Sequence, residues 1–127
     1  METVTESIKT FPPLRNATER LAKFTGAEMI VLFGSRARGD ADDDSDWDIC
    51  VLLPDGIKPG EFTSITLWPV VAGLGIAVQV YPMRLSVFLA KRNDINTVSR
   101  DVDRDGILLY QKPGSRNIEF QRSRIVA

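Results

Sequence analysis

Two apolar runs, residues 28–33 and 46–53, stand out in the pattern of hydrophobic and polar positions along the chain. Short apolar runs that are bounded by turn residues are typical of strands, so each run predicts a strand. A third strand is expected over residues 75–81, where apolar and polar positions alternate up to Pro82, which closes it. Residues 34–45, which join the first two runs, form a polar connection.

Apolar residues at helical spacing predict helices around these strands. The first helix is expected to start at Pro12-Pro13, because proline suits a first turn, and to end at Gly26. The apolar residues that recur at helical spacing in it are Leu14, Ala17, Leu21 and Phe24. Residues 60–72 fit a helix despite Pro69.

The second half of the chain predicts two further helices and a last strand. One helix is expected at about 84–91. Another is expected to start at Asp94 and to carry Ile95, Val98 and Val102 on one face. Asp105-Gly106 then turns the chain into a short extended segment at 107–110.

These elements predict an α+β fold, a small mixed β-sheet with helices mainly on one face, in one domain that spans 1–127. A chain of 127 residues is long enough to bury one core. Residues 1–10 are expected to be a loose lead-in or a short helix. The tail 114–127 is expected to be flexible or, alternatively, to dock on a partner or a second subunit. In the second case the protein could form a homo-oligomer.

The connection after the first strand carries groups that suit a polyphosphate. Gly34 has no Cβ and lets the backbone approach a ligand closely. Ser35 stands where a short helix can begin, and its hydroxyl and the free backbone N–H groups there suit an anion. Arg36 and Arg38 add guanidinium groups, which match phosphate oxygens. We therefore predict that Gly34, Ser35, Arg36 and Arg38 bind a nucleotide.

Two aspartates open the second strand, ten residues after Ser35. Side chains on a strand alternate between its faces, so Asp46 and Asp48 project from the same side, roughly 7 Å apart. Mg²⁺ is usually held by one or two carboxylates together with substrate phosphates, and Mn²⁺ accepts the same oxygens. We predict that both aspartates are metal ligands and catalytic residues. Alone, a Gly-Ser pair or an Asp-x-Asp is commonly a turn or a cap, but their ordered combination is specific.

Gly34-Ser35, ten further residues and Asp46-Trp47-Asp48 resemble the signature of the DNA polymerase β-like nucleotidyltransferase superfamily. The stretch from Gly34 to Asp40 is similar to its small prokaryotic branch of minimal, antitoxin-type nucleotidyltransferases. The resemblance implies a palm-like fold, a triphosphate held by the Gly-Ser turn and Mg²⁺ held by the aspartates. It implies transfer of a nucleoside monophosphate, with ATP as the first candidate donor, to a hydroxyl. The partner in that branch is often a helical HEPN-domain protein, and the pair acts as toxin and antitoxin.

The family places a third carboxylate on the later strand, and here the chain departs from that pattern. The matching face of residues 75–81 carries Ala77 and Gln79, and neither replaces a carboxylate. Catalysis depends on that group more than nucleotide binding does. A degenerate nucleotidyltransferase, which binds a nucleotide or a protein without transferring anything, is therefore the alternative function. A small-molecule modifier of the antibiotic nucleotidyltransferase kind is a third alternative, and the sequence favours it less because it shows no second domain to shape a substrate pocket.

Composition narrows the chemistry further. The chain has no histidine, which excludes Ser-His and Cys-His catalysis and histidine metal sites. Its 16 basic and 17 acidic residues give a net charge of −1, which argues against electrostatic binding of nucleic acid by the whole domain. The single Cys50 is expected to be a buried filler in a cytoplasmic protein without a membrane span or signal peptide. Candidates for the pocket rim are Trp47, Trp68, Tyr81 and Pro82.

Overall fold

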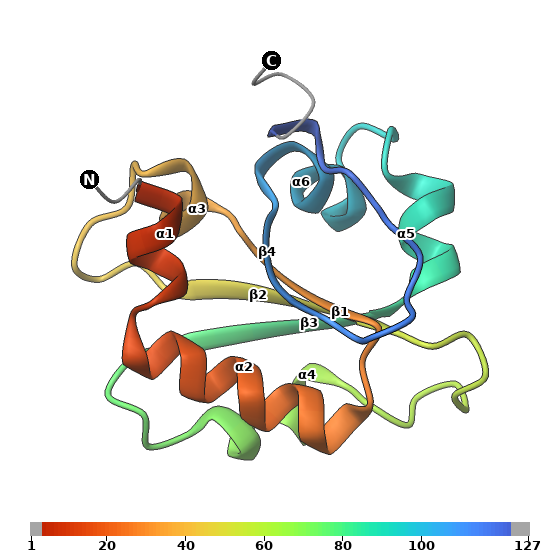
Figure 1. The fold of residues 1–127 in the computed structure, drawn as a ribbon, viewed down its shortest axis with the longest axis horizontal. Helices are drawn as coiled ribbons and strands as arrows, with labels where there is room; N and C mark the ends of the chain where they lie inside the picture. The colour runs from red at the N-terminus through yellow and green to blue at the C-terminus, as the bar shows by residue number, and fades with distance from the viewer. Residues whose placement is uncertain (1–3, 123–127) are drawn as a thin grey trace.

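Residues 4–122 are described by the computed structural model, and Figure 1 shows them as a four-stranded sheet between helices. The strand order is β3-β2-β1-β4. The central strand β1 (Met29–Phe33) runs antiparallel to both β2 (Trp47–Leu53) and β4 (Ile107–Gln111). The edge strand β3 (Val78–Arg84) runs parallel to β2. This mixed sheet confirms the predicted α+β class.

Helices cover both faces of the sheet (Figure 1), whereas they were expected mainly on one. On one face lie α2 (Pro12–Thr25), α4 (Ser64–Leu67) and the 3-10 helix η1 (Trp68–Val71). On the other lie α5 (Leu85–Lys91) and α6 (Val98–Asp105). The reason is the continuous apolar run of β1, whose five residues are all buried. Such a strand has apolar side chains on both faces, and both must be covered.

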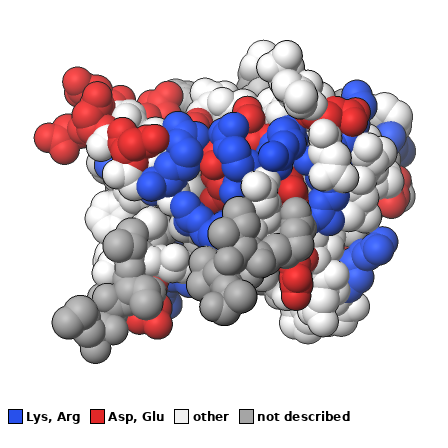
Figure 2. Space-filling view, turned by 90° about the horizontal axis from the view of Figure 1, so that it is seen from above, with Lys and Arg blue, Asp and Glu red and all other residues white. Residues whose placement is uncertain are grey.

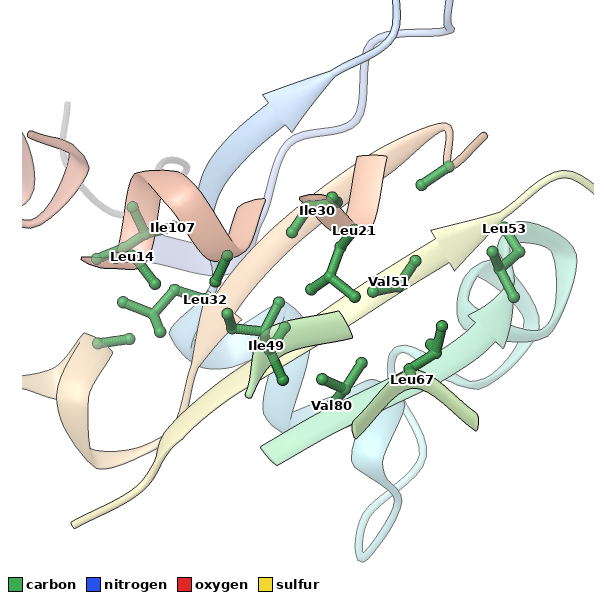
Figure 3. Packing of buried hydrophobic residues seen from close by; sticks show 14 residues of the cluster. Leu14, Leu21, Ile30, Leu32, Ile49, Val51, Leu53, Leu67, Val80 and Ile107 are labelled. Atoms are coloured by element: carbon green, nitrogen blue, oxygen red, sulfur yellow. The ribbon is translucent and has the colours of Figure 1, made fainter. Parts of the chain in front are cut away.

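Each face of the sheet has its own hydrophobic cluster. The cluster under α2 is shown in Figure 3 and contains, among others, Leu14, Leu21, Ile30, Leu32, Ile49, Val51 and Val80. The cluster under α5 and α6 contains Met29, Val31, Cys50, Phe88, Val102 and Phe120. Cys50 is fully buried as predicted, and burial raises the pKa of its thiol. Burying one such side chain contributes about 1.5–3 kcal/mol, so the two clusters fix the sheet that carries the site.

The third strand continues beyond the proline that was expected to close it. The Trp47 N–H donates to the Ala77 carbonyl at 2.8 Å. In a parallel ladder, the backbone N–H and C=O groups of alternate residues point to the same neighbouring strand. The backbone groups of Gln79 and Tyr81 therefore also point toward β2. Pro82 faces the free edge of the sheet, where a missing N–H breaks no ladder bond. The strand therefore starts later than predicted and runs through Pro82 to Arg84.

The helix that was expected from Asp94 begins at Val98. Thr97 caps it, because its Oγ1 accepts a hydrogen bond from the Arg100 N–H at 3.1 Å. Ile95 therefore precedes the helix, and 81% of it is exposed. The expected helix over 60–72 is divided into α4 and η1, with the proline, which lacks an N–H donor, in η1. Phe24 lies on the exposed side of α2.

Both ends of the described chain pack on the domain. Residues 1–10 contain the short helix α1 (Val4–Lys9), one of the two alternatives from the sequence. In the predicted tail, Phe120 is buried in the second cluster, and the Arg122 guanidinium donates to the Ala37 carbonyl. The tail up to Arg122 thus docks on its own chain, while its last residues, 123–127, lie outside the described part. No helix among the described residues is long and apolar enough to cross a bilayer.

Candidate active site

The end of β1 and the start of β2 lie side by side in the middle of the sheet, at the end of the sheet where α3 begins. Phe33 pairs with Asp48 in the antiparallel ladder. Gly34 follows β1 directly and therefore lies against Asp48, and α3 (Ser35–Arg38) begins at the next residue. The structure thus brings together the Gly-Ser turn and the second aspartate of the sequence motif.

Gly34 is the point where the turn and the carboxylate come closest. Its φ of 78° and ψ of −161° lie in a region that glycine alone enters readily. A Cβ on Gly34 would lie 3.3 Å from Cγ of Asp48 and would collide with the carboxylate oxygen Oδ2. The N–H groups of Ala37 and Arg38 both donate to the Gly34 carbonyl at 3.0 Å, which closes the short helix. Backbone conformation and available space therefore both require glycine here.

Asp48 and Asp46 form the acidic side of the site. Burial raises the pKa of the half-buried Asp48, the charge of Asp46 raises it further, and a hydrogen bond from the Tyr81 hydroxyl opposes the shift. A partly desolvated carboxylate beside a second one is stabilised by a divalent cation. Asp46 is exposed, precedes β2 and borders an adjoining hollow together with Trp68 and Gln79. The two carboxylates are hard oxygen donors and fit Mg²⁺ or Mn²⁺.

Arg38 and Arg104 form the basic side of the site. Nη1 of Arg38 lies 2.8 Å from Oδ2 of the buried Asp105, and Arg104 donates to the same carboxylate at 2.8 and 3.0 Å. Burial by itself raises the pKa of Asp105, but the hydrogen bonds from Arg104 and Arg38 hold it below its ordinary value. Asp105 therefore stays charged and keeps two guanidinium groups together. Figure 2 shows basic side chains gathered around carboxylates on the face that carries α3 and α6.

Except for Asp46, which borders the hollow beside Trp68, these groups line one cleft of about 290 Å³, which we call the phosphate cleft. Its lining residues are Phe33, Gly34, Ser35, Arg38, Asp48, Tyr81, Val98, Asp101, Arg104 and Asp105. Guanidinium groups on one side and a metal-binding carboxylate on the other suit a polyphosphate bound with its cation. A larger hollow of about 500 Å³ beside α2 has one carboxylate, Glu19, and contains no residue of the Gly-Ser turn and neither Asp46 nor Asp48. The chemistry therefore assigns the site to the smaller cleft.

Three residues singled out in the sequence, Asp46, Arg36 and Gln79, do not line the phosphate cleft. Arg36 does not line the cleft: its Nε and Nη2 donate to the Ser45 carbonyl at 3.2 and 3.0 Å. Its guanidinium lies 4.8 Å from the centre of the Trp47 ring, so it fastens the loop that leads into β2. Gln79 is the register partner of Asp48 in β3. An amide therefore stands beside Asp48, and the described residues contain no group of three acidic, cysteine or histidine side chains that could hold a metal.

Sequence patterns do not reveal Arg104 and Asp105 as site residues. Asp105 reads as part of a turn with Gly106, and Arg38, with which it pairs, lies 67 residues away in the chain. Their meeting depends on the packing of α6 against β1, which no local pattern encodes. Tyr81, a candidate for the pocket rim, does line the cleft.

The mixed sheet holds the Gly-Ser turn against Asp48, with Asp46 two residues before it and guanidinium groups opposite, and these residue types suit a nucleotide with its metal ion. The chain belongs to the nucleotidyltransferase domain family, whose family model matches residues 14–103. It is a minimal nucleotidyltransferase of the polymerase β-like superfamily, as its motif predicts. Transferase chemistry is thereby confirmed as the class of its activity.

One relative supports this assignment, and one solved structure shares the fold. The chain is 31% identical over 120 residues to the protein adenylyltransferase MntA of Aphanizomenon flos-aquae (strain 2012/KM1/D3), and the match covers 92% of this chain and 79% of that protein. A crystal structure of a toxin-antitoxin with AMP-PNP shares the fold, with a TM-score of 0.54 and 22% identity. That match covers 78% of this chain and 74% of the other.

Proposed function

We propose that this protein transfers AMP from ATP to a hydroxyl group of a partner protein, with Mg²⁺ or Mn²⁺ as the metal. The close approach of the Gly34 backbone to Asp48 carries the proposal, because it sets a phosphate-binding turn against a metal-binding carboxylate. Protein adenylyl transfer is also the activity in the name of the MntA relative.

Each side of the phosphate cleft has its own task in this proposal. Ser35, at the start of α3, and the guanidinium groups of Arg38 and Arg104 bind the phosphates that leave as pyrophosphate. Asp46 and Asp48 would hold the divalent ion, which supplies positive charge at the α-phosphate. Arg36, fastened to the loop, supports the position of this pair and does not contact the phosphates.

The reaction itself is a displacement at the α-phosphorus. The acceptor oxygen forms a bond to that phosphorus, the bond to the bridging oxygen breaks, and pyrophosphate leaves while the hydroxyl proton passes to solvent. The protein contributes by holding the triphosphate still, so that the hydroxyl can approach in line. Arg38 and Arg104 stabilise the charge that grows on the leaving group.

The acceptor is proposed to be a helical, HEPN-type protein, so that the two form a toxin-antitoxin pair. The resemblance to antitoxin-type nucleotidyltransferases motivates this partner. The name of the MntA relative supports a protein acceptor, and the neighbour of similar fold was solved as a toxin-antitoxin with AMP-PNP.

The test is an incubation with ATP labelled at either the α- or the γ-phosphate, in a lysate of the source cells with Mg²⁺. We expect α-label, and no γ-label, to become attached to a protein. Asp46→Asn and Asp48→Asn should remove the labelling, as should a chelator, whereas Asp44→Asn in the same exposed loop should not. Attachment of γ-label would identify phosphoryl transfer and contradict the proposal.

Gln79 beside Asp48 favours the second candidate function, a degenerate nucleotidyltransferase that binds ATP without transferring AMP. The variant Gln79→Asp places a carboxylate at the register partner of Asp48. If ATP binds to both proteins but label transfer occurs with Gln79→Asp alone, the degenerate function is correct. Transfer by the unchanged protein rules it out.

A further inference from the structure

We propose that a second hollow, between the start of α4 and the middle of β3, holds the nucleoside of the bound triphosphate. This inference rests on the proposed function, because it takes the phosphate cleft as the place of the phosphates. The hollow measures about 380 Å³. It is lined by Tyr81, Pro82, Met83, Val98 and Phe62, with two hydroxyl residues at the start of α4. We call it the nucleoside hollow.

Shared walls join the nucleoside hollow to the phosphate cleft. Tyr81 and Val98 line both cavities. The hollow beside α2 and the one beside Trp68 share no lining residue with the phosphate cleft. A triphosphate held by Arg38 and Arg104 therefore has a continuous path past Tyr81 and Val98, and its nucleoside reaches the second hollow without leaving the protein surface.

The walls of the nucleoside hollow suit a flat ring. Tyr81 is held in place by an edge contact with Phe33, whose ring centroid lies 5.1 Å away. Val98 presents an apolar side chain that is 38% exposed at the first turn of α6. Pro82 and Met83 add further apolar surface. Apolar and aromatic walls of this kind pack against the face of a nucleobase.

The same walls predict little discrimination between bases. None of the described residues that line the hollow carries a carboxylate or an amide side chain. Carboxylate and amide side chains distinguish one base edge from another and reject the wrong one, whereas the serine and threonine hydroxyls at the start of α4 can bond to either. Binding through surface contact alone favours large rings, so ATP and GTP should bind with similar affinity and CTP and UTP more weakly.

Calorimetry with Mg²⁺ and either ATP or inorganic tripolyphosphate tests the assignment. The unchanged protein should bind ATP about tenfold more tightly than tripolyphosphate, the gain expected from packing one base. Ser64→Trp puts an indole into the hollow from an exposed position on α4. It should reduce the affinity for ATP to that for tripolyphosphate and leave the latter unchanged.

Two further variants keep the test independent of folding defects. Ser86→Trp adds the same ring at an exposed position on α5, away from both cavities, and should keep the tenfold difference. Val98→Ala removes only two methyl groups from the shared wall and should lower ATP affinity about threefold. A thermal unfolding curve of each variant shows that it is folded.

The outcomes separate this inference from the proposed function. If neither ligand binds, or if Asp48→Asn binds tripolyphosphate as well as the unchanged protein does, the proposed function fails. If both ligands bind equally well, or if Ser64→Trp retains the advantage of ATP, the phosphate cleft stands and the nucleoside lies elsewhere. A strong preference for ATP over GTP would contradict a hollow without base readout.

Discussion

The two sides of the phosphate cleft are built in opposite ways. One side, which we call the motif side, is a continuous segment from Phe33 to Asp48 that contains the end of β1, α3 and the start of β2. The other, which we call the clamp side, combines α6 with the docked tail 115–122 and supplies Arg104 and Asp105. The comparison teaches that metal and phosphate chemistry can be encoded locally, while the arrangement of the opposing charges depends on tertiary packing.

The clamp side is held together by a few shared contacts. Asp103 is fully buried and pairs with Arg92 at 2.6 Å and with Arg100 at 3.6 Å. Arg92 also donates to the Glu119 carbonyl, and Arg100 donates to the side chain of Gln121. The same two arginines thus fasten α6 and the tail to each other. Because a buried carboxylate is costly without partners, this network specifies one position of α6 over the motif side.

Loss of the Phe120 ring should have the largest effect on the molecule. Phe120 is buried, and a Cβ on Gly106 would lie 2.9 Å from its ring, so ring and backbone are in close contact. Phe120→Ala should lower the free energy of unfolding by about 3–5 kcal/mol. Phe24→Ala, which removes a ring that is 55% exposed, should cost much less. Urea unfolding measures both, and equal losses would show that the tail is not part of the core.

Removal of the Asp105 charge, which binds Arg38 and Arg104, should have the second largest effect on stability. Asp105→Asn leaves Arg38 and Arg104 without their shared anion and should lower stability at pH 7 by about 3 kcal/mol. Because the folded pKa of Asp105 lies below the ordinary 3.8, its stabilisation is complete above that value and is lost as the pH falls through the folded pKa. The difference between the two proteins should therefore narrow in acid. Asp101→Asn, at a half-exposed position, is the control.

The motif side can be tested with two glycines. Gly34 and Gly39 both have positive φ, at 78° and 86°, but only a Cβ on Gly34 would meet Asp48. Gly34→Ala should weaken Mg²⁺-dependent ATP binding about a hundredfold, because strain and collision add up. Gly39→Ala adds strain in open space and should weaken binding much less. If calorimetry finds equal losses, backbone conformation alone explains the glycine, and the close approach has no functional role.

The same division decides what could be predicted from the sequence. The proximity of Gly34, Ser35 and Asp48 could be predicted because strand, turn and strand follow one another, so that chain order determines which groups meet. Arg36 carries a guanidinium group that could bind phosphate, but this group points away from the phosphate cleft. It lies over the Trp47 ring and donates to the Ser45 carbonyl. Residue type predicts what a side chain can bind, whereas its direction depends on neighbours that the pattern does not specify.

The rest of the fold was missed for reasons of the same kind. Pro82 interrupts the pattern of a strand, and its place in β3 becomes possible only because β3 is the edge of the sheet. Phe120 reads as one of several apolar residues in a tail without helical or strand periodicity, and its burial depends on the space beside Gly106, which has no Cβ. Arg104 reads as one of several charges on α6. Each depends on a partner that is distant in sequence, and no local periodicity carries that information.

Arg104 should contribute less to ATP binding than Gly34 does but more than Arg122 in the tail. Arg104→Ala removes one of two guanidinium groups from the phosphate cleft and should weaken ATP binding about tenfold. Arg104→Lys keeps the charge without the planar fork and should recover part of the loss. Lys91→Ala, at an exposed position at the end of α5, serves as the control. If Arg104→Ala and Lys91→Ala bind ATP with equal affinity, Arg104 does not contribute to ATP binding and the clamp side only stabilises the fold.

The smallest expected effect belongs to Arg122, which acts on the motif side from the docked tail. Its guanidinium donates to the Ala37 carbonyl in the short helix that follows Gly34. Arg122→Ala should weaken ATP binding about fivefold, less than the full contribution of a charge-assisted hydrogen bond, because Arg122 contacts α3 and not the nucleotide. Arg122→Lys should restore part of the loss. Arg116→Ala, at an exposed position in the same tail, should change nothing. If Arg122→Ala lowers the melting temperature but leaves the affinity for ATP unchanged, the tail stabilises the fold without positioning the phosphate-binding helix, and the two sides of the cleft are independent.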